Sequence, residues 1–222
     1  MPEASDLVLN PEKTLTYRVC AKVVGSLAWL FFHPVVEGAE NIPLEGPVII
    51  APIHRSNVDF AFSLFISPRK VFFMAKEGVF HPKPFAELLT KLGAFPVNRA
   101  TTDRESMRLS EEVLRRGQAL VLFPEGTRKE GTTVGTLHDG AMFLAARTKA
   151  KIVPVGIAGS EKAMPKGAKL PRFTKIHVVV GTPIDPPSGE GRISRSEVTA
   201  KTEELRKELE AVYGEARQRL AR

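Results

Sequence analysis

Short apolar runs alternate with amphipathic stretches along most of the chain. Helices are expected at 56–66, 84–92, 103–116, 137–149 and from 195 to the end, with Gly117 in the position of a helix-ending residue. The apolar continuity of the strand candidates indicates burial on both faces of a sheet. The pattern therefore predicts an α/β fold with a mixed, largely parallel sheet flanked by helices. The expected strands are 47–53 (PVIIAPI), 70–75 (KVFFMA), 94–97 (AFPV), 119–123 (ALVLF), 152–157 (IVPVGI) and 175–180 (KIHVVV).

An apolar run near the N-terminus, 19–32 (VCAKVVGSLAWLFF), precedes this pattern. As a helix it would be roughly 21 Å long, against roughly 30 Å of hydrocarbon in a bilayer, so it is too short to span a membrane. Lys22 interrupts the run and Trp29 lies near its end, which suits a helix in the membrane interface. A helix packed on the core is an equally good interpretation. We expect an apolar, membrane-docking segment at 1–34 and one α/β domain at 35–222.

Composition narrows the class of protein. The 222 residues are 43% hydrophobic and 26% charged, which is typical of a folded globular chain. A single cysteine, Cys20, excludes a disulfide framework within the chain, a cysteine-rich zinc site and a CxxC redox pair. Acidic residues among the first dozen argue against a secretory leader, so we expect a protein that is not secreted.

The charge balance favours an anionic partner. There are 32 basic and 25 acidic residues, a net charge of +7. Nucleic acid, an acidic membrane surface and a phosphorylated or CoA-linked substrate all fit such a charge. No nucleic-acid motif is present and aromatic residues are few, so we expect no nucleic-acid partner. One basic loop, which fits either an anionic ligand or simple solvation, carries Lys162, Lys166, Lys169, Arg172 and Lys175.

The first candidate for chemistry is a histidine and an aspartate in residues 54–59 (HRSNVD), directly after an expected strand. Two residues five apart on a helix point about 140° apart. His54 and Asp59 therefore meet only if His54 stands in the turn before the helix and Asp59 in its first turn. Ser56 is a natural N-cap, so Asp59 also fits a capping box with no catalytic role.

Two further motifs end expected strands. Residues 123–128 (FPEGTR) would place backbone N–H groups and a guanidinium at a strand's carboxyl end, where α/β proteins bind ligands. This is a candidate phosphate cradle, although a turn in which Glu125 pairs with Arg128 fits equally well. Residues 93–99 (GAFPVNR) end in Asn98 and Arg99. No GxSxG, P-loop, GxGxxG or HExxH motif occurs, and no metal-ligand spacing links the other histidines, so no metal is expected.

Together with 152–157, these motifs resemble, in order and spacing, the four motifs of the glycerolipid acyltransferases, the family of the lysophosphatidic acid acyltransferases. The resemblance implies transfer of a fatty acyl group from acyl-CoA or acyl-carrier protein to the hydroxyl of a lysophosphatidic acid-type acceptor, making phosphatidic acid. It implies no cofactor beyond the acyl donor, and a peripheral or monotopic enzyme at the cytoplasmic face of a membrane. A glycerol-3-phosphate or phosphoglycolipid acceptor, or a non-catalytic lipid-binding module, stays open.

The resemblance also assigns roles to residues. His54 would be the general base and Asp59 the group that orients it. Pro154 would shape the acyl pocket, unless it only marks the edge or a bulge of a strand. Backbone N–H groups near the 54–59 turn are the expected donors to the oxyanion. The acceptor's phosphate would be bound by Asn98, Arg99, Gly126, Thr127 and Arg128, with Glu125 orienting an arginine or accepting a hydrogen bond from the glycerol. Ile53 and Lys129 depart from the family pattern, which often has Asn and Ser there.

Overall fold

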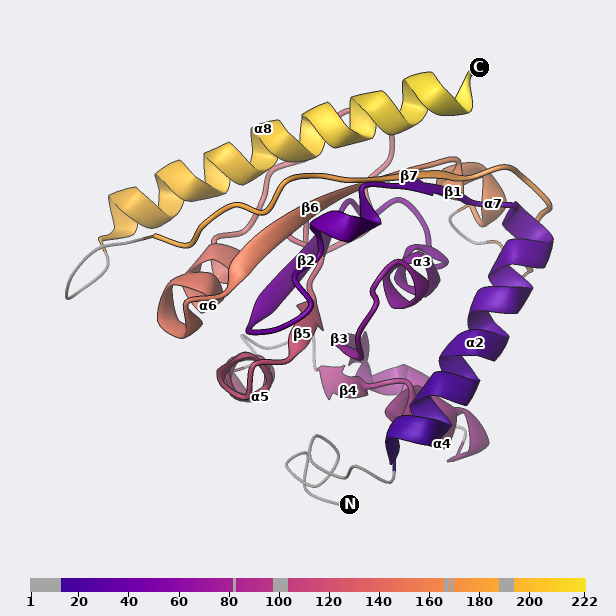
Figure 1. Ribbon diagram of the computed structural model, residues 1–222, viewed down its shortest axis with the longest axis horizontal. Coiled ribbons are helices and arrows are strands. Elements are labelled where there is room, and N and C mark those ends of the chain that lie inside the picture. The colour runs from indigo at the N-terminus through magenta and orange to yellow at the C-terminus, as the bar shows by residue number, and fades with distance from the viewer. Residues whose placement is uncertain (1–12, 82, 98–103, 166–167, 169, 188–193) are drawn as a thin grey trace.

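A computed structural model describes residues 13–81, 83–97, 104–165, 168, 170–187 and 194–222. In these residues a seven-stranded sheet has the order β1-β7-β6-β2-β5-β3-β4. Five of its six pairings are parallel, and only β6 and β7 pair antiparallel. The prediction of a mixed, largely parallel sheet flanked by helices is confirmed (Figure 1). The strands are β1 (Val35–Glu37), β2 (Val48–Pro52), β3 (Val71–Lys76), β4 (Ala94–Val97), β5 (Ala119–Val121), β6 (Lys151–Ala158) and β7 (His177–Val180).

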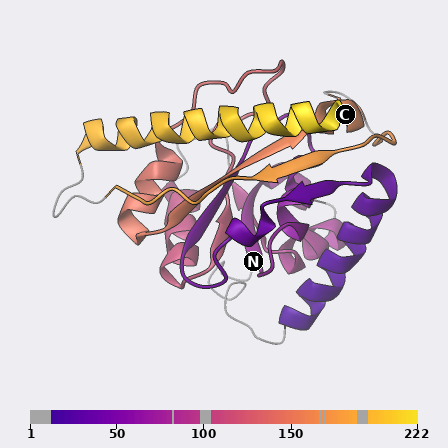
Figure 2. The ribbon, with the colours of Figure 1, turned by 45° about the horizontal axis from the view of Figure 1, so that its top comes forward.

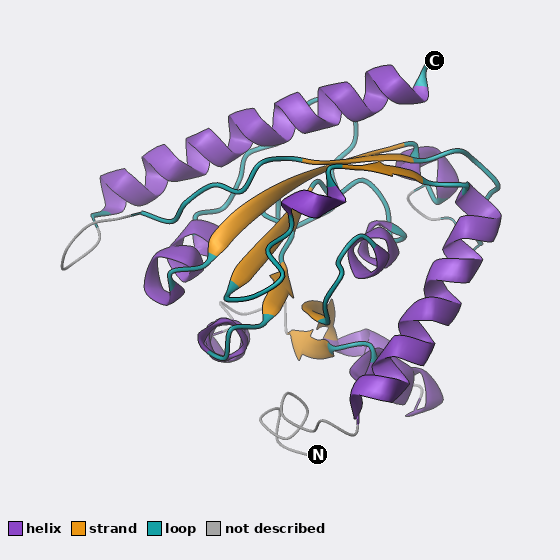
Figure 3. Cartoon of the chain, viewed as in Figure 1, coloured by secondary structure: helices purple, strands orange, loops and turns teal. Residues whose placement is uncertain are grey.

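Helices cover both faces of the sheet (Figure 3). On one face α8 (Arg195–Leu220) lies along β6 and β7 and extends across the molecule (Figure 2). It packs on α6 (Gly140–Thr148), which in turn packs on α5 (Arg104–Arg115). On the other lie α3 (Asp59–Phe65), α4 (Lys83–Lys91) and α2 (Lys13–Phe32). Short helices complete the described chain: η1 (Ala39–Asn41), η2 (Glu77–Phe80) and α7 (Ser160–Ala163).

The core forms where the apolar runs predicted it. All five residues of β2 are buried, because this strand lies inside the sheet between β5 and β6 with helices on both faces. Gly117 follows α5 with a φ of 69°, the left-handed conformation expected of a helix-ending glycine. Two short elements were not predicted from the sequence: β1, which has only three residues, and the four-residue α7.

The N-terminal helix α2 packs on the core with one side, as one of the two interpretations of its apolar run predicted. Tyr17, Ala28 and Phe32 are buried, and α2 packs on α3 and α4. Its other side leaves apolar residues more than half exposed, among them Val23 and Trp29. Within the described residues, no helix is long and apolar enough to cross a bilayer.

Candidate active site

The two best sequence motifs meet at the carboxyl ends of two neighbouring strands of the sheet. Residues 54–59 follow β2 and residues 123–128 follow β5, and these strands are parallel neighbours. The carboxyl ends of parallel neighbours lie side by side, so the two loops come together. Strand order, rather than sequence spacing, therefore builds the site.

His54 and Asp59 form a buried pair. His54 Nδ1 lies 3.1 Å from Asp59 Oδ2, and the two residues are 8% and 0% exposed. The same carboxylate oxygen accepts 2.7 Å hydrogen bonds from the backbone N–H groups of Arg55 and Ser56. An ionised carboxylate only accepts hydrogen bonds, so the neutral imidazole carries its proton on Nδ1. Nε2 then has a free lone pair, which a proton acceptor needs.

The turn before α3 departs from the expected cap. The helix was predicted from residue 56, but α3 begins at Asp59. Half of the expected capping box is present, since the Asp59 carboxylate accepts from the Ser56 N–H. The other half is absent, because Ser56 Oγ instead donates to the Met164 carbonyl and accepts from the Val58 N–H. Asp59 thus both stabilises this turn and holds the His54 ring.

Glu125 pairs with Arg55 rather than with Arg128. Arg55 Nη1 donates to both carboxylate oxygens of Glu125, at 3.0 and 2.8 Å, and both side chains are fully buried. The turn in which Glu125 pairs with Arg128 is therefore wrong, because the neighbouring loop supplies a closer cation. The carboxylate also accepts from the backbone N–H groups of His54 and Gly135, each at 2.9 Å.

Contacts of its carbonyl and of its ring face also hold His54 in place. Its carbonyl accepts from the Lys129 N–H at 2.9 Å and from Arg55 Nη1 at 3.1 Å. Its ring stacks on Phe123, with ring centroids 4.1 Å apart and 26° between the planes. The backbone and ring of His54 are thereby fixed by both loops of the site.

The expectation for the oxyanion donors is wrong for most of the 54–59 turn. The N–H of His54 donates to Glu125, those of Arg55 and Ser56 to Asp59, and that of Val58 to Ser56 Oγ. These donors build the turn itself. They are already committed before any substrate arrives.

The remaining candidate residues lie in different surroundings. Gly126 and Thr127 are exposed and Arg128 is partly exposed, in the part of the 123–128 loop that follows the buried Glu125. Asn98 and Arg99 lie outside the described residues. The ring of His138, a histidine set aside in the sequence, packs against Gly126, since a Cβ there would lie 3.0 Å from its Nε2.

Pro154 is buried in β6, an interior strand, so the interpretation as an edge residue is wrong. Its carbonyl faces β7 and accepts from the Gly181 N–H, and β7 ends at the preceding residue, Val180. A strand residue's nitrogen faces the same side as its carbonyl. The nitrogen of Pro154, which has no hydrogen to donate, therefore faces the point where β7 and its ladder of hydrogen bonds end.

Three residues of this network escaped the sequence analysis. Arg55 lies inside the first motif and Phe123 begins the second, so their positions were a usable signal. Tyr213 of α8, whose ring lies over Arg55, gave no signal because it is far away in sequence. Among the described residues, no three His, Cys, Asp or Glu side chains are grouped closely enough to hold a metal ion.

The fold and this site define an α/β enzyme whose reactive groups gather at the carboxyl edge of its sheet. A model of the acyltransferase family matches residues 33–158, more than half of the chain. The chain therefore belongs to the acyltransferase family, as its motifs indicated.

Relatives with known names agree with that family. The chain is 29% identical over 198 residues to the 1-acyl-sn-glycerol-3-phosphate acyltransferase of Bacillus subtilis, covering 87% of this chain and 96% of that protein. It is 26% identical over 183 residues to the chloroplastic 1-acyl-sn-glycerol-3-phosphate acyltransferase of Arabidopsis thaliana, covering 80% of this chain but only 51% of that protein. The crystal structure of the 1-acyl-sn-glycerophosphate acyltransferase of Thermotoga maritima is similar, with a TM-score of 0.75, 27% identity, and coverage of 95% of this chain and 82% of that chain.

Proposed function

We propose that this protein transfers a fatty acyl group from acyl-CoA or acyl-carrier protein to the free hydroxyl of lysophosphatidic acid, making phosphatidic acid. The single observation that carries the chemistry is the buried pair of His54 Nδ1 and Asp59 Oδ2, 3.1 Å apart. The names of the relatives support the choice of acceptor and product. A purely lipid-binding module would have no use for an imidazole held in this tautomer.

The proposed reaction needs no covalent enzyme intermediate. His54 Nε2 takes the proton of the acceptor's hydroxyl while that oxygen attacks the thioester carbonyl carbon. Asp59 stabilises the imidazolium that results. The tetrahedral oxyanion then collapses, the C–S bond breaks, and the leaving thiolate takes the proton back from Nε2. General-base catalysis of this kind contributes about 10²- to 10⁴-fold in rate.

The acceptor's phosphate is proposed to bind at the outer part of the 123–128 loop. Thr127 and Arg128 are accessible there, and Arg128 can make a bidentate, charge-assisted contact with a phosphate. Asn98 and Arg99 stay proposed members of this site on the family resemblance alone. Glu125 takes the positioning role, because Arg55 and two backbone N–H groups occupy its buried carboxylate. Pro154 keeps its proposed place beside the acyl chain.

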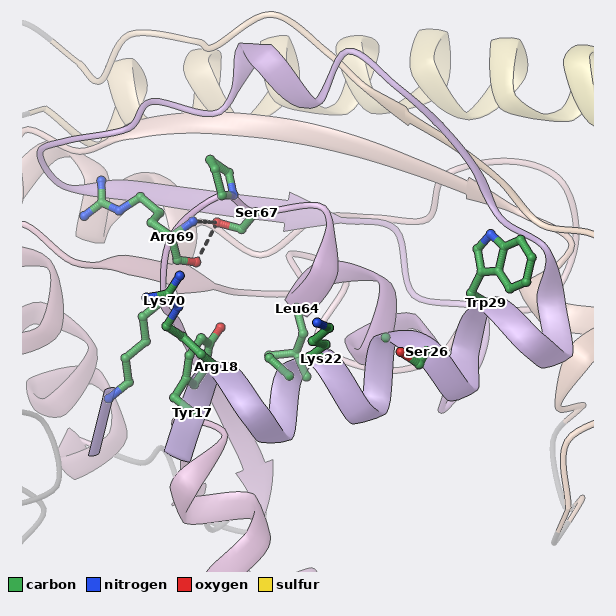
Figure 4. Close-up of a pocket in the computed structure, with 12 residues that line it drawn as sticks. Tyr17, Arg18, Lys22, Ser26, Trp29, Leu64, Ser67, Arg69 and Lys70 are labelled. Atoms are coloured by element: carbon green, nitrogen blue, oxygen red, sulfur yellow. Dashed lines mark hydrogen bonds between the residues drawn. The ribbon is translucent and has the colours of Figure 1, made fainter. Parts of the chain in front are cut away.

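We also propose that the protein works peripherally or monotopically at the cytoplasmic face of an anionic membrane. A groove of about 630 Å³ lies between α2 and the segment that joins α3 to β3 (Figure 4). The residues that line it include four basic ones and no acidic one: Arg18, Lys22, Arg69 and Lys70. The guanidinium of Arg69 donates to the carbonyls of Gly46 and Gly117. Trp29 lies at its far end, as at a membrane interface. His54 lines neither this groove nor a second cavity of about 590 Å³ between the 134–139 loop and α8.

The basic loop extends this surface toward the site. Leu170 and Phe173 are 78% and 72% exposed, and Phe173 stacks on Phe31 of α2 with ring centroids 4.7 Å apart. Lys162 lies in the short helix α7 rather than in the loop, and it is exposed, as are Arg172 and Lys175. Lys166 and Lys169 lie outside the described residues. The loop begins near Met164, whose carbonyl accepts from Ser56 in the His54 turn. Lipid substrates would therefore reach the site from the docked surface.

The test of the reaction is thiol release from a long-chain acyl-CoA, with and without lysophosphatidic acid in mixed micelles. Wild-type protein should release thiol only with the acceptor present, and His54→Ala should lower kcat by about 10²- to 10⁴-fold while the thermal melt stays close to wild type. The exposed His81, which belongs to no motif, gives the matched control His81→Ala with unchanged activity. Wild-type silence with acyl-CoA and acyl-carrier protein donors, and with glycerol 3-phosphate as acceptor, would sink the proposal and favour a lipid-binding module.

Membrane docking is tested by co-sedimentation with vesicles of phosphatidylcholine, with and without phosphatidylglycerol. Arg18→Gln with Lys22→Gln should weaken binding to the anionic vesicles, and Val23→Ser should weaken binding to both kinds. Deleting 1–32 is a poorer test, because it also removes the buried Tyr17 and Phe32. Phe143→Ser changes an apolar residue of α6, 46% exposed on the opposite face of the sheet, and should have no effect. Binding unchanged by the α2 variants would contradict the docking surface.

A further inference from the structure

The C-terminal helix reaches the proposed reaction centre from outside the region that the family model matches. That region ends at residue 158, and α8 begins at Arg195. One turn of α8 nevertheless covers the site from behind the sheet. The Arg55 guanidinium lies over the ring of Tyr213, 5.2 Å from the ring centroid, and Tyr213 is only 3% exposed.

Close backbone packing fixes this part of α8. Gly156 of β6 lies directly under it, since a Cβ on Gly156 would come within 2.5 Å of the carbonyl of Val212 and 2.6 Å of the nitrogen of Tyr213. Gly181, the residue after β7, is also close to α8, since a Cβ there would lie 2.9 Å from Cγ1 of Val212. Only side-chain-free positions allow such an approach. The height of the Tyr213 ring above the sheet is therefore set by backbone contacts.

A chain of buried contacts leads from this ring to the base. Tyr213 covers Arg55, Arg55 donates to both oxygens of Glu125, and Glu125 accepts from the His54 N–H. Arg55 Nη2 also donates to the Thr133 carbonyl at 2.8 Å, whereas Nε is buried and has no hydrogen-bond partner among the residues that the structure describes. Hydrogen bonds thus hold one end of the guanidinium, and the aromatic ring holds its face. A cation over a ring is attracted more strongly where water is excluded, as here.

We propose that Tyr213 is a positioning residue: by clamping Arg55 against Glu125, it keeps the His54 imidazole in the position that acyl transfer requires. This inference rests on the proposed function. Burial, followed by the nearby Glu161, raises the pKa of Tyr213, while the charge of Arg55 and a side-chain hydrogen bond with Arg55 lower it. We assign the clamp to the face of the ring, over which the guanidinium lies. A misplacement of about 1 Å at a reacting group can cost about 10²-fold in rate. A partial release of Arg55 should therefore lower kcat by about 10-fold.

The first experiment observes His54 without any substrate. Its imidazole NMR signals are assigned by their loss in His54→Gln and compared in Tyr213→Phe, which keeps the ring, and Tyr213→Leu, which removes it. The matched control is Leu209→Ala, which empties a fully buried position one turn earlier on the same helix. We expect shifted His54 signals in Tyr213→Leu and wild-type signals in Tyr213→Phe and Leu209→Ala.

The second experiment measures turnover. Tyr213→Leu should lower kcat by about 10-fold with the acceptor KM within about two-fold of wild type, because the acceptor's own contacts are untouched. Tyr213→Phe should keep wild-type kcat, and Leu209→Ala should lower the melting temperature without lowering kcat well below the melt. If α8 served stability alone, Tyr213→Leu and Leu209→Ala would behave alike: either both would lose kcat or neither would.

The outcomes separate the two proposals. Unchanged His54 signals in Tyr213→Leu, or equal changes in Leu209→Ala, would overturn the positioning role. A wild-type protein without acyl transfer would overturn the proposed function, while the NMR comparison still decides whether Tyr213 positions His54. If Tyr213→Leu does not fold, Arg55→Lys breaks the same clamp from the other side, and unchanged His54 signals there would overturn the inference.

Discussion

Two glycine-to-alanine substitutions should move stability in opposite directions, although each adds a single methyl group. In Gly156→Ala the new Cβ would lie 2.5 Å from the Val212 carbonyl, whereas ordinary contact begins at 3.4 Å. Because the neighbouring atoms are backbone, α8 would have to move by about 0.9 Å, the difference between these distances. In Gly214→Ala, no neighbouring atom of the described part of the chain lies within 4 Å of the new Cβ, and the position is inside α8.

The magnitudes follow from these surroundings. Overpacking a tight interface costs roughly 1–3 kcal/mol. For a chain of this size the melting temperature changes by about 2–4 °C per kcal/mol, so Gly156→Ala should melt about 2–12 °C below wild type. Replacing an unstrained helix glycine by alanine stabilises by roughly 0.4–1 kcal/mol. Gly214→Ala should therefore melt about 1–4 °C above wild type.

Thermal unfolding followed by far-ultraviolet circular dichroism measures both variants under one condition. The comparison uses its own control, because the chemical change is identical and only the space around it differs. A Gly156→Ala protein that melts with or above wild type would refute the close packing of α8 on β6. Such a result would also remove the reason to think that backbone contacts fix the position of Tyr213. In the expected case, the displacement of α8 should move the Tyr213 ring away from Arg55.

Two further predictions concern the acceptor and acid stability. Arg128→Ala should raise the acceptor KM more than it lowers kcat, and lost turnover with normal acceptor binding would contradict its role at the phosphate. Desolvation raises the pKa of Glu37, but hydrogen bonds from His177 and Arg219 outweigh it and lower that pKa below 4.5. A carboxylate whose pKa is lower in the folded state than in the unfolded state stabilises the protein at pH values above its unfolded-state pKa. This stabilisation is lost as the pH falls through the folded-state pKa. The melting temperature of Glu37→Gln should therefore fall less steeply below about pH 4.5 than that of wild type, and parallel curves would argue against this ion pair.

Local pattern was sufficient for six of the seven strands of the described sheet and for the His54–Asp59 pair. Continuous apolar residues mark β2 because both of its faces are covered, and a strand-to-helix turn leaves few ways for residues five apart to meet. The start of α3 was misplaced by three residues because Ser56 finds a distant partner, the Met164 carbonyl, in place of its own helix. A competing tertiary hydrogen bond overrode the local cap.

The partner of Glu125 could not be read from the sequence. Arg55 and Arg128 were both available cations, and the nearer one in sequence is the wrong one. The choice depends on β2 and β5 being neighbours in the sheet, which hydrophobic periodicity does not encode. Tyr213 is further removed still, because its contact depends on where α8 crosses β6.

The arrangement assigns the two faces of the sheet different tasks in the proposed reaction. The groove beside α2 and the exposed apolar residues of α2 itself lie on the side of α2 and α3, while α8 packs on the opposite face (Figures 1 and 3). His54 stands between them at the edge of the sheet, held by Asp59 from α3 and, through Glu125 and Arg55, by Tyr213 from α8. Substitutions on the outer face of α2 should therefore change where the enzyme works, and those at the Tyr213 contact should change how fast it turns over. Variants from the two groups share no contact, so their effects on activity at a membrane should multiply.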